Sequence, residues 1–304
     1  MLIHRRPAAA LLVALMLAST LSTSPVAAVS PAPFTGAAPI LVGAGDIADC
    51  ATDSARATAR LLGHIPGTVI TLGDNVYPSG SASGFRRCYD PTWGRYKART
   101  RPAAGNHDYE APGAGPYFAY FGAAAGVPGE GWYSYDLGTW HIVVLNSDCA
   151  AVAGCGPGSP QVDWLRQDLA LHAGAHVLAY WHHPLFSSGS HGSSSSVRTF
   201  WKVLYQAGAE LVLNGHDHDY ERFARQDASG RLDNRHGIRE FVVGTGGAPL
   251  RPRASEARNS RTFRRVHGVL ELTLRSDGYS WRFVPVGRTT WTDTGSTRTH
   301  AAPP

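Results

Sequence analysis

The stretch TVITLGDNVYPSG (residues 68–80) constrains the fold more than any other part of the sequence. Its first residues are β-branched or apolar, which predicts a buried strand. The strand ends abruptly on Gly73 and the carboxylate of Asp74, and a phenol follows at Tyr77. A buried strand that delivers an acid and a phenol to one place predicts a polar site at its carboxyl end.

The same arrangement, a strand followed by side chains that can bind a metal ion, occurs five times. A glycine precedes the metal-capable residue in four of the five segments, where it lets the chain turn sharply off the strand. Ligands of open α/β sheets gather outside the carboxyl ends of the strands, so these residues are expected to converge. The segments are GAGD (Asp46), LGDNVY (Asp74, Tyr77), AGNHD (Asn106, His107, Asp108), AYWHHP (His182, His183) and NGHDHDYER (His216, His218).

Between these segments, strand patterns alternate with helix patterns. A strand at residues 38–46, a helix at residues 52–63 closed by Gly63, and the strand of residues 68–72 form a β-α-β unit. Further along, Gly138-Thr139 and Asp277-Gly278 each indicate a hairpin. The pattern predicts one α/β domain over residues 38–290.

The first thirty residues have the composition of a signal peptide. A positive start precedes an apolar run and small residues suited to cleavage near Ala28. The run is too short for a membrane span, and no later segment reaches membrane length. We therefore expect residues 1–30 to be removed and the mature protein to be secreted. At the other end of the chain, we expect the tail at residues 291–304 to be loosely ordered.

The charge balance argues against a dedicated nucleic-acid binder. The sequence has 28 basic and 23 acidic residues, a net charge of +5, of which Arg5 and Arg6 leave with the leader. Residues 251–265 form a local basic cluster, which we interpret as a solvated loop in preference to a phosphate-steering patch.

Four cysteines in an exported chain predict two disulfides. Cys149 and Cys155 flank a short segment and are spaced to close a small loop, which would leave Cys50 with Cys88. Three pairings exist, and the sequence does not choose among them.

GAGDIA (residues 43–48) raises an alternative, because it fits the loose dinucleotide-binding fingerprint with Asp74 as the ribose-binding acid. The spacing from Ala48 to Asp74 is long for that role, and the fingerprint leaves the histidine motifs unexplained. The five motifs together offer only oxygen and nitrogen donors, which favours iron, zinc or manganese over copper(I).

In order and in kind, the motifs GD, GDxxY, GNHD, the histidine of AYWHHP and GHDHDYER resemble those of the calcineurin-like metallophosphoesterases. The tyrosine of GDNVY narrows the resemblance to the purple acid phosphatases. Because the first motif follows directly after the expected leader, the chain resembles their small, single-domain bacterial type. The resemblance implies an α/β fold in which two β-sheets pack together and helices flank them.

The resemblance also implies a set of metal ligands. Asp46, Tyr77 and His218 match the ligands of the first metal, Asn106, His182 and His216 match those of the second, and Asp74 matches the bridging carboxylate. A phenol is ionised only beside a strong Lewis acid, so Fe(III) is expected at the Tyr77 position, and Fe(II), Zn or Mn at the second.

Three further histidines are assigned by the resemblance. His107 matches the family's substrate-facing histidine, and His191 lies where the family often places a second one. His183 is expected to be a structural neighbour of the ligand His182.

The activity that the resemblance implies is hydrolysis of small phosphomonoesters by attack of a metal-bound hydroxide, with His107 and His191 assisting. A phosphodiesterase or nucleotidase with the same two-metal site is an alternative. A secreted metal-binding protein without enzymatic activity is a more distant one. The natural substrate and the oligomeric state do not follow from the sequence.

Overall fold

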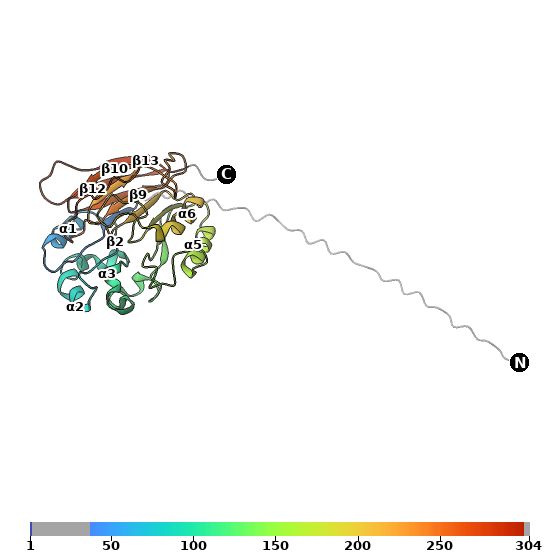
Figure 1. Cartoon of the computed structure of the whole chain (residues 1–304), viewed down its shortest axis with the longest axis horizontal. Coiled ribbons are helices and arrows are strands. Elements are labelled where there is room, and N and C mark those ends of the chain that lie inside the picture. The colour runs from blue at the N-terminus through green and yellow to red at the C-terminus, as the bar shows by residue number, and fades with distance from the viewer. Residues whose placement is uncertain (2–36, 301–304) are drawn as a thin grey trace. The chain divides into compact units, whose positions relative to one another are not determined.

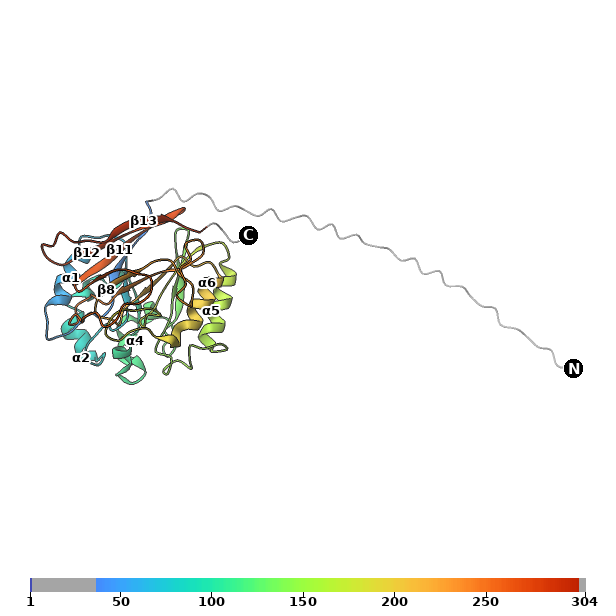
Figure 2. The ribbon, with the colours of Figure 1, turned by 45° about the horizontal axis from the view of Figure 1, so that its top comes forward.

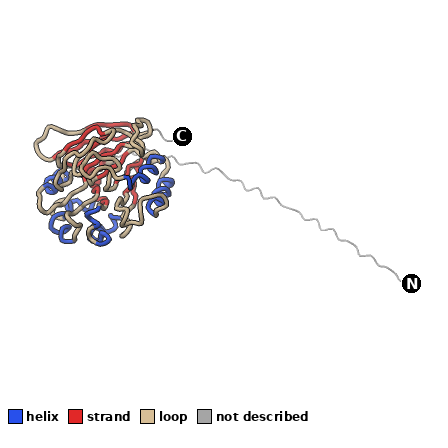
Figure 3. The backbone as a smooth tube through the Cα atoms, in the orientation of Figure 1, coloured by secondary structure: helices blue, strands red, loops and turns tan. Residues whose placement is uncertain are grey.

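The computed structural model of the chain describes Met1 and residues 37–300, and it contains two β-sheets. Apart from Met1, the predicted signal peptide lies outside the described residues. Figure 1 labels the elements, and Figure 3 shows strands across the upper part of the view, with helices below them and at the sides. No helix among the described residues is long and apolar enough to cross a membrane.

The first sheet has six strands in the order β13-β12-β11-β1-β2-β3. Its strands β1, β2 and β3 are parallel, and β11, β12 and β13 extend it in antiparallel fashion. The strands are β1 (Ile40–Ala44), β2 (Thr68–Leu72), β3 (Thr100–Ala103), β11 (Gly268–Arg275), β12 (Gly278–Pro285) and β13 (Thr294–Arg298).

The second sheet has seven strands in the order β10-β8-β9-β7-β6-β5-β4, of which β5, β6, β7 and β9 are parallel. The predicted hairpins at Gly138-Thr139 and Asp277-Gly278 are confirmed as β4-β5 and β11-β12. The strands are β4 (Tyr133–Leu137), β5 (Trp140–Val144), β6 (His176–Tyr180), β7 (Leu211–Asn214), β8 (Tyr220–Phe223), β9 (Arg239–Val243) and β10 (Ser260–Arg264).

The helices are short. The three longest are α1 (Ser54–Leu62), which ends at Gly63 as predicted, α5 (Pro160–Leu171) and α6 (Arg198–Gln206). The others are α2 (Ala82–Gly84), η1 (Phe85–Tyr89), η2 (Trp93–Arg99), α3 (Asn106–Tyr109), η3 (Pro112–Ala114), α4 (Gly115–Phe121), η4 (Gly122–Ala125) and η5 (Ser195–Val197).

Both faces of the second sheet are buried, which explains its nearly continuous apolar strands. In β6, Leu178 and Tyr180 point into the core between the two sheets, while Val177 and Ala179 point to the other face. There they join a second core that includes Leu165 of α5 and residues of α6. Figure 1 shows α5 and α6 side by side along this part of the molecule.

The C-terminal tail differs from its prediction. Residues 294–298 form β13, which pairs with β12 at the edge of the first sheet (Figure 2). The buried carboxylate of Asp293 anchors this strand, because it accepts hydrogen bonds from Tyr220 (2.6 Å) and from Nε of Arg222 (2.6 Å). The sequence gives no sign of these contacts, since the partners lie about seventy positions apart.

Two disulfides, Cys50–Cys88 and Cys149–Cys155, resolve the pairing that the sequence left open. The first joins the loop after β1 to η1, within the long segment that precedes β3. Trp93 of η2 adds a second tie there by donating its indole N–H to Thr58 of α1 (3.0 Å). The long segment is therefore folded against the first sheet.

A buried imidazole joins the β4-β5 hairpin to α5. His141 is 1% exposed, and its Nδ1 and Nε2 each lie 2.8 Å from a carboxylate, of Asp136 and Asp168 respectively. A neutral imidazole carries one N–H, so two such contacts require the doubly protonated cation. Burial opposes the charge, but the two carboxylates outweigh it and raise the pKa of His141 above 6.5.

This network predicts a pH-dependent contribution to stability. Since folding raises the pKa of His141, its contribution is complete below the unfolded value of 6.5 and is lost as pH rises through the folded-state pKa. The pKa of Asp168 is lowered, so its contribution is lost below about pH 3.8. His141→Gln should lower the free energy of unfolding by about 3 kcal/mol at pH 5–6 and by less at pH 9.

Urea unfolding of both proteins across this pH range measures the difference, and His64→Gln, at an exposed position, is the matched control. A loss that is equal at pH 5 and pH 9 would contradict the assignment of a charged His141.

Candidate metal centre

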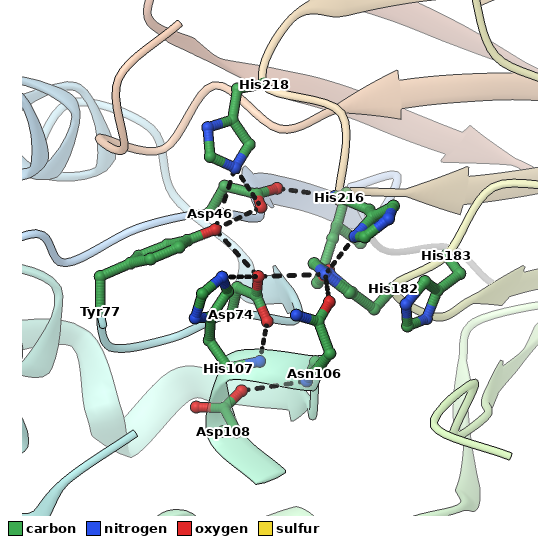
Figure 4. Close-up of polar contacts among 12 residues, drawn as sticks. Asp46, Asp74, Tyr77, Asn106, His107, Asp108, His182, His183, His216 and His218 are labelled. Atoms are coloured by element: carbon green, nitrogen blue, oxygen red, sulfur yellow. Dashed lines mark hydrogen bonds and ion pairs between the residues drawn. The ribbon is translucent and has the colours of Figure 1, made fainter. Parts of the chain in front are cut away.

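The seven predicted metal ligands lie together where the carboxyl ends of the two sheets meet (Figure 4). The first sheet provides Asp46 after β1, Asp74 and Tyr77 after β2, and Asn106 after β3; the second provides His182 after β6 and His216 and His218 after β7. Within each sheet these strands are parallel, so their carboxyl ends lie at the same edge of the sheet. Residues from both edges contribute, and the site therefore spans both sheets.

Three of these residues leave their strands in the left-handed backbone region. Asp46 has φ 60°, Asp74 has φ 50° and His216 has φ 73°. A non-glycine residue held there costs about 1–3 kcal/mol and persists only where its surroundings fix it. Gly73, at φ 85°, makes the same turn without that cost, and a Cβ there would lie 2.5 Å from the His182 ring. This close approach explains the glycine before Asp74.

One group of donor atoms surrounds the phenolic oxygen of Tyr77. This oxygen lies 2.8 Å from Oδ1 of Asp46, 2.9 Å from Oδ2 of Asp74 and 3.1 Å from Nε2 of His218. All four side chains are buried or nearly so.

A second group surrounds Nε2 of His182. This nitrogen lies 3.2 Å from Oδ2 of Asp74, 3.1 Å from Oδ1 of Asn106 and 3.2 Å from Nδ1 of His216. Oδ2 of Asp74 therefore belongs to both groups. Ligand atoms at right angles around an ion at about 2.1 Å lie about 3 Å apart, so both groups have the spacing of a coordination sphere.

The orientation of the rings supports a cation at these positions. Nδ1 of His182 donates to the carbonyl of Leu72 (2.8 Å), and Nδ1 of His218 donates to the carbonyl of Pro249 (2.8 Å). Each neutral ring therefore turns the lone pair of Nε2 toward the carboxylates, and acceptor atoms face one another. Without metal, the Tyr77 hydroxyl and a protonated His182 donate to these carboxylates; bound cations would take the place of those hydrogen atoms.

The electrostatics of the groups point the same way. Burial and the carboxylates of Asp46 and Asp74 raise the pKa of Tyr77 well above 10.0. Burial alone would lower the pKa of His182, but Asp74 outweighs it and raises this pKa to about 9. The site thus attracts positive charge, and a phenolate forms in it only beside a strong Lewis acid.

The structure also brings both predicted substrate-facing histidines to this site. Nδ1 of His107 contacts the carbonyl of Pro78, which leaves Nε2 3.9 Å from Oδ2 of Asp74. The exposed His191 has its ring centroid 4.5 Å from that of His216. His183 lies beside the predicted ligand His182, with Nδ1 2.9 Å from Oγ of Ser147.

Two buried acids that the sequence analysis left without a role position these residues. Asp108 accepts hydrogen bonds from the backbone N–H groups of Gly105 (3.0 Å) and Asn75 (3.2 Å), and so joins the loops after β2 and β3. Asp217 accepts the backbone N–H of His191 (2.7 Å) and holds the loop that carries this histidine at the site. Their position inside the motifs AGNHD and NGHDH was a sequence signal for a role at the site. Their hydrogen-bond partners could not be predicted from the sequence.

Asp136, His141 and His172 form a second group whose donor atoms are close enough for a metal ion. The rings of His141 and His172 stack 3.7 Å apart at 15°. An ion lies in the plane of each imidazole that binds it, and two nearly parallel planes offer no shared position. The geometry therefore favours the proton-bound network described above.

Two layered sheets and two donor groups that share a carboxylate define the class of a dinuclear metalloprotein. The chain belongs to the Calcineurin-like phosphoesterase family, which it matches over residues 41–220. It is 26% identical over 204 residues to Purple acid phosphatase 15 of Arabidopsis thaliana, covering 55% of this chain and 38% of the relative. The chain thus spans well under two thirds of that relative's length.

Two solved structures share the fold. The purple acid phosphatase PPD1 from yellow lupin seeds superposes with a TM-score of 0.68 at 18% identity, covering 87% of this chain and 55% of that one. GAP50, the anchor in the inner membrane complex of Plasmodium, superposes with a TM-score of 0.66 at 13% identity, covering 88% and 91%. At these identities the likeness shows the fold alone.

The tight packing around Asp74 leads to a prediction for Gly105. A Cβ at this position would lie 2.3 Å from both N and Oδ1 of Asp74, although the backbone itself suits any residue. Gly105→Ala should therefore displace the shared carboxylate and weaken metal binding about 10- to 100-fold. Metal retained after dialysis against graded chelator measures the effect.

Gly115→Ala is the control, because no atom lies within 4 Å of its added Cβ. Retention equal to wild type in Gly105→Ala, with circular dichroism confirming the fold of both variants, would show that the position of Asp74 does not govern metal binding.

Proposed function

We propose that the protein is a metal-dependent phosphoric ester hydrolase that cleaves phosphomonoesters in the manner of the purple acid phosphatases. The observation that carries this proposal is the shared oxygen, Oδ2 of Asp74, which lies within 3.2 Å of both Tyr77 and His182. A carboxylate placed in this way would hold both cations of a two-metal phosphatase. Membership of the family supports the same reading.

We assign one set of ligands to each ion. Asp46, Tyr77 and His218 would hold the first, Asn106, His182 and His216 the second, and Asp74 both. We propose Fe(III) at the Tyr77 position, because an ionised phenol needs a strong Lewis acid, and Fe(II), Zn or Mn at the second. Two such ions, when bound, activate water as a nucleophile near neutral pH and neutralise charge on the phosphate.

The two histidines at the rim would act on the substrate. The contact of His107 with Pro78 directs its Nε2 toward the site, where a protonated ring donates to a phosphate oxygen or to the leaving oxygen. The exposed ring of His191 beside His216 is placed to do the same from the other side. Asp217 would serve as the positioning residue for His191.

A non-enzymatic role is the alternative to hydrolysis, since GAP50 shares this fold and is the anchor in the inner membrane complex of Plasmodium. Fold alone does not determine function. The decisive feature is the donor set, and in this chain all seven positions carry side chains able to bind metal. A scaffold that had lost catalysis would be free to lose such buried, strained residues.

We also propose that the protein acts outside the cytoplasm. Two disulfides join its loops, and such bonds persist in oxidising compartments. The composition of residues 1–30 supports export.

Asp74→Asn tests the proposed activity. The amide keeps the shape of the side chain but removes the charge that both groups share, so hydrolysis of p-nitrophenyl phosphate should fall by more than about 1,000-fold. Asp277→Asn, in the hairpin between β11 and β12, is the control and should keep full activity.

Measured in parallel, bis(p-nitrophenyl) phosphate separates a phosphodiesterase from a phosphomonoesterase. Activity retained by Asp74→Asn on either ester would contradict the proposed role of the shared carboxylate.

A further inference from the structure

The basic cluster at residues 251–265 has no role in the function proposed above. It contains six arginines and one glutamate, a net charge of +5 that equals the net charge of the entire sequence. The rest of the chain is therefore neutral overall, and its positive charge is concentrated in this one segment.

Backbone hydrogen bonds fix the start of this segment beside the metal centre. The N–H of Arg251 donates to the carbonyl of His218 (3.0 Å), and the carbonyl of Pro249 accepts from Nδ1 of the same histidine (2.8 Å). The N–H of Ala254 donates to the carbonyl of Ser188 (2.9 Å), in the loop that carries His191. The segment thus lies between a metal ligand and the loop of the second rim histidine.

Among these arginines, Arg251 is the one placed to act on the site. It is exposed, and within residues 37–300 its side chain has no ion pair or hydrogen bond, whereas Arg253 pairs with Glu256 (3.6 Å) and lies over the ring of Phe263. The backbone bonds of Arg251 to His218 and of Ala254 to Ser188 place Arg251 at the rim, on the side of the loop that carries His191.

The opposite rim carries acidic groups. Asp148, next to the disulfide-bonded Cys149, is half-buried, and burial raises its pKa. The charges of His182 and Asp74 also influence this pKa, which indicates that Asp148 lies toward that end of the site.

We propose that Arg251 binds a second anionic group of the substrate, so that the preferred substrates are small phosphate esters that carry a further phosphate. This inference rests on the proposed hydrolase function and names its substrate class. A planar guanidinium donates two parallel hydrogen bonds to a phosphate, and the exposed, unpaired position of Arg251 leaves it free to do so. Esters with one anionic group lack this contact.

Fructose 1,6-bisphosphate and fructose 6-phosphate form a suitable pair of probes. With phosphate release as the assay, we expect wild-type kcat/KM to be about tenfold higher for the bisphosphate. Arg251→Ala should remove this preference, mainly through KM, and leave fructose 6-phosphate nearly unchanged. Arg251→Lys keeps the positive charge but loses the two parallel N–H donors of the guanidinium, so it should keep part of the preference for the bisphosphate.

Arg275→Ala is the matched control. Arg275 is exposed at the end of β11, in the hairpin whose Ser276 carbonyl accepts from His176 at the start of β6, while the site lies at the other end of β6. Loss of one positive charge there should leave the preference intact.

Equal kcat/KM for the two sugars in wild type, or a loss in Arg251→Ala that is equal for both, would overturn the proposal. If the metal-loaded protein hydrolyses neither these sugar phosphates nor p-nitrophenyl phosphate, the proposed function fails. Affinities of the two sugar phosphates for wild type and Arg251→Ala, measured by calorimetry, then test the arginine separately. Wild type should bind the bisphosphate about tenfold more tightly than the monophosphate, and Arg251→Ala should bind both equally.

Discussion

One carboxylate oxygen, Oδ2 of Asp74, ties the architecture to the site. It lies 2.9 Å from the phenol of Tyr77 and 3.2 Å from the imidazole of His182, which follow strands of different sheets. The two sheets must therefore pack so that their carboxyl ends meet at this atom. Backbone support comes from the N–H of His107, which donates to Oδ1 of Asp74 (2.8 Å) and fixes the carboxylate's orientation.

The arrangement of the site lowers the free energy of unfolding of the metal-free protein. Buried acceptors face one another, and Asp46, Asp74 and His216 occupy backbone conformations that cost energy. The extensive cores on both faces of the second sheet offset these costs, and bound cations would relieve the repulsion among the acceptors. Metal binding and the order of these loops are thus expected to be coupled.

Local patterns made much of this predictable. A strand followed by glycine and a metal-capable residue is visible in the sequence, so the convergence of these side chains around Asp74 was predictable, as was the helix ending at Gly63. Contacts between distant segments were not. The anchoring of β13 by Asp293 and the docking of Arg251 beside His218 depend on partners tens of residues away. From the sequence alone, Arg251 was therefore interpreted as part of a solvated loop.

The most direct test of this account is metal analysis of the purified protein together with its visible spectrum and that of Tyr77→Phe. If Tyr77 and Asp74 belong to one dinuclear centre, the protein should hold two ions per chain, with iron among them. It should show a broad charge-transfer band that disappears in Tyr77→Phe. An active protein without bound metal, or a band that survives the loss of the phenol, would contradict the central claim.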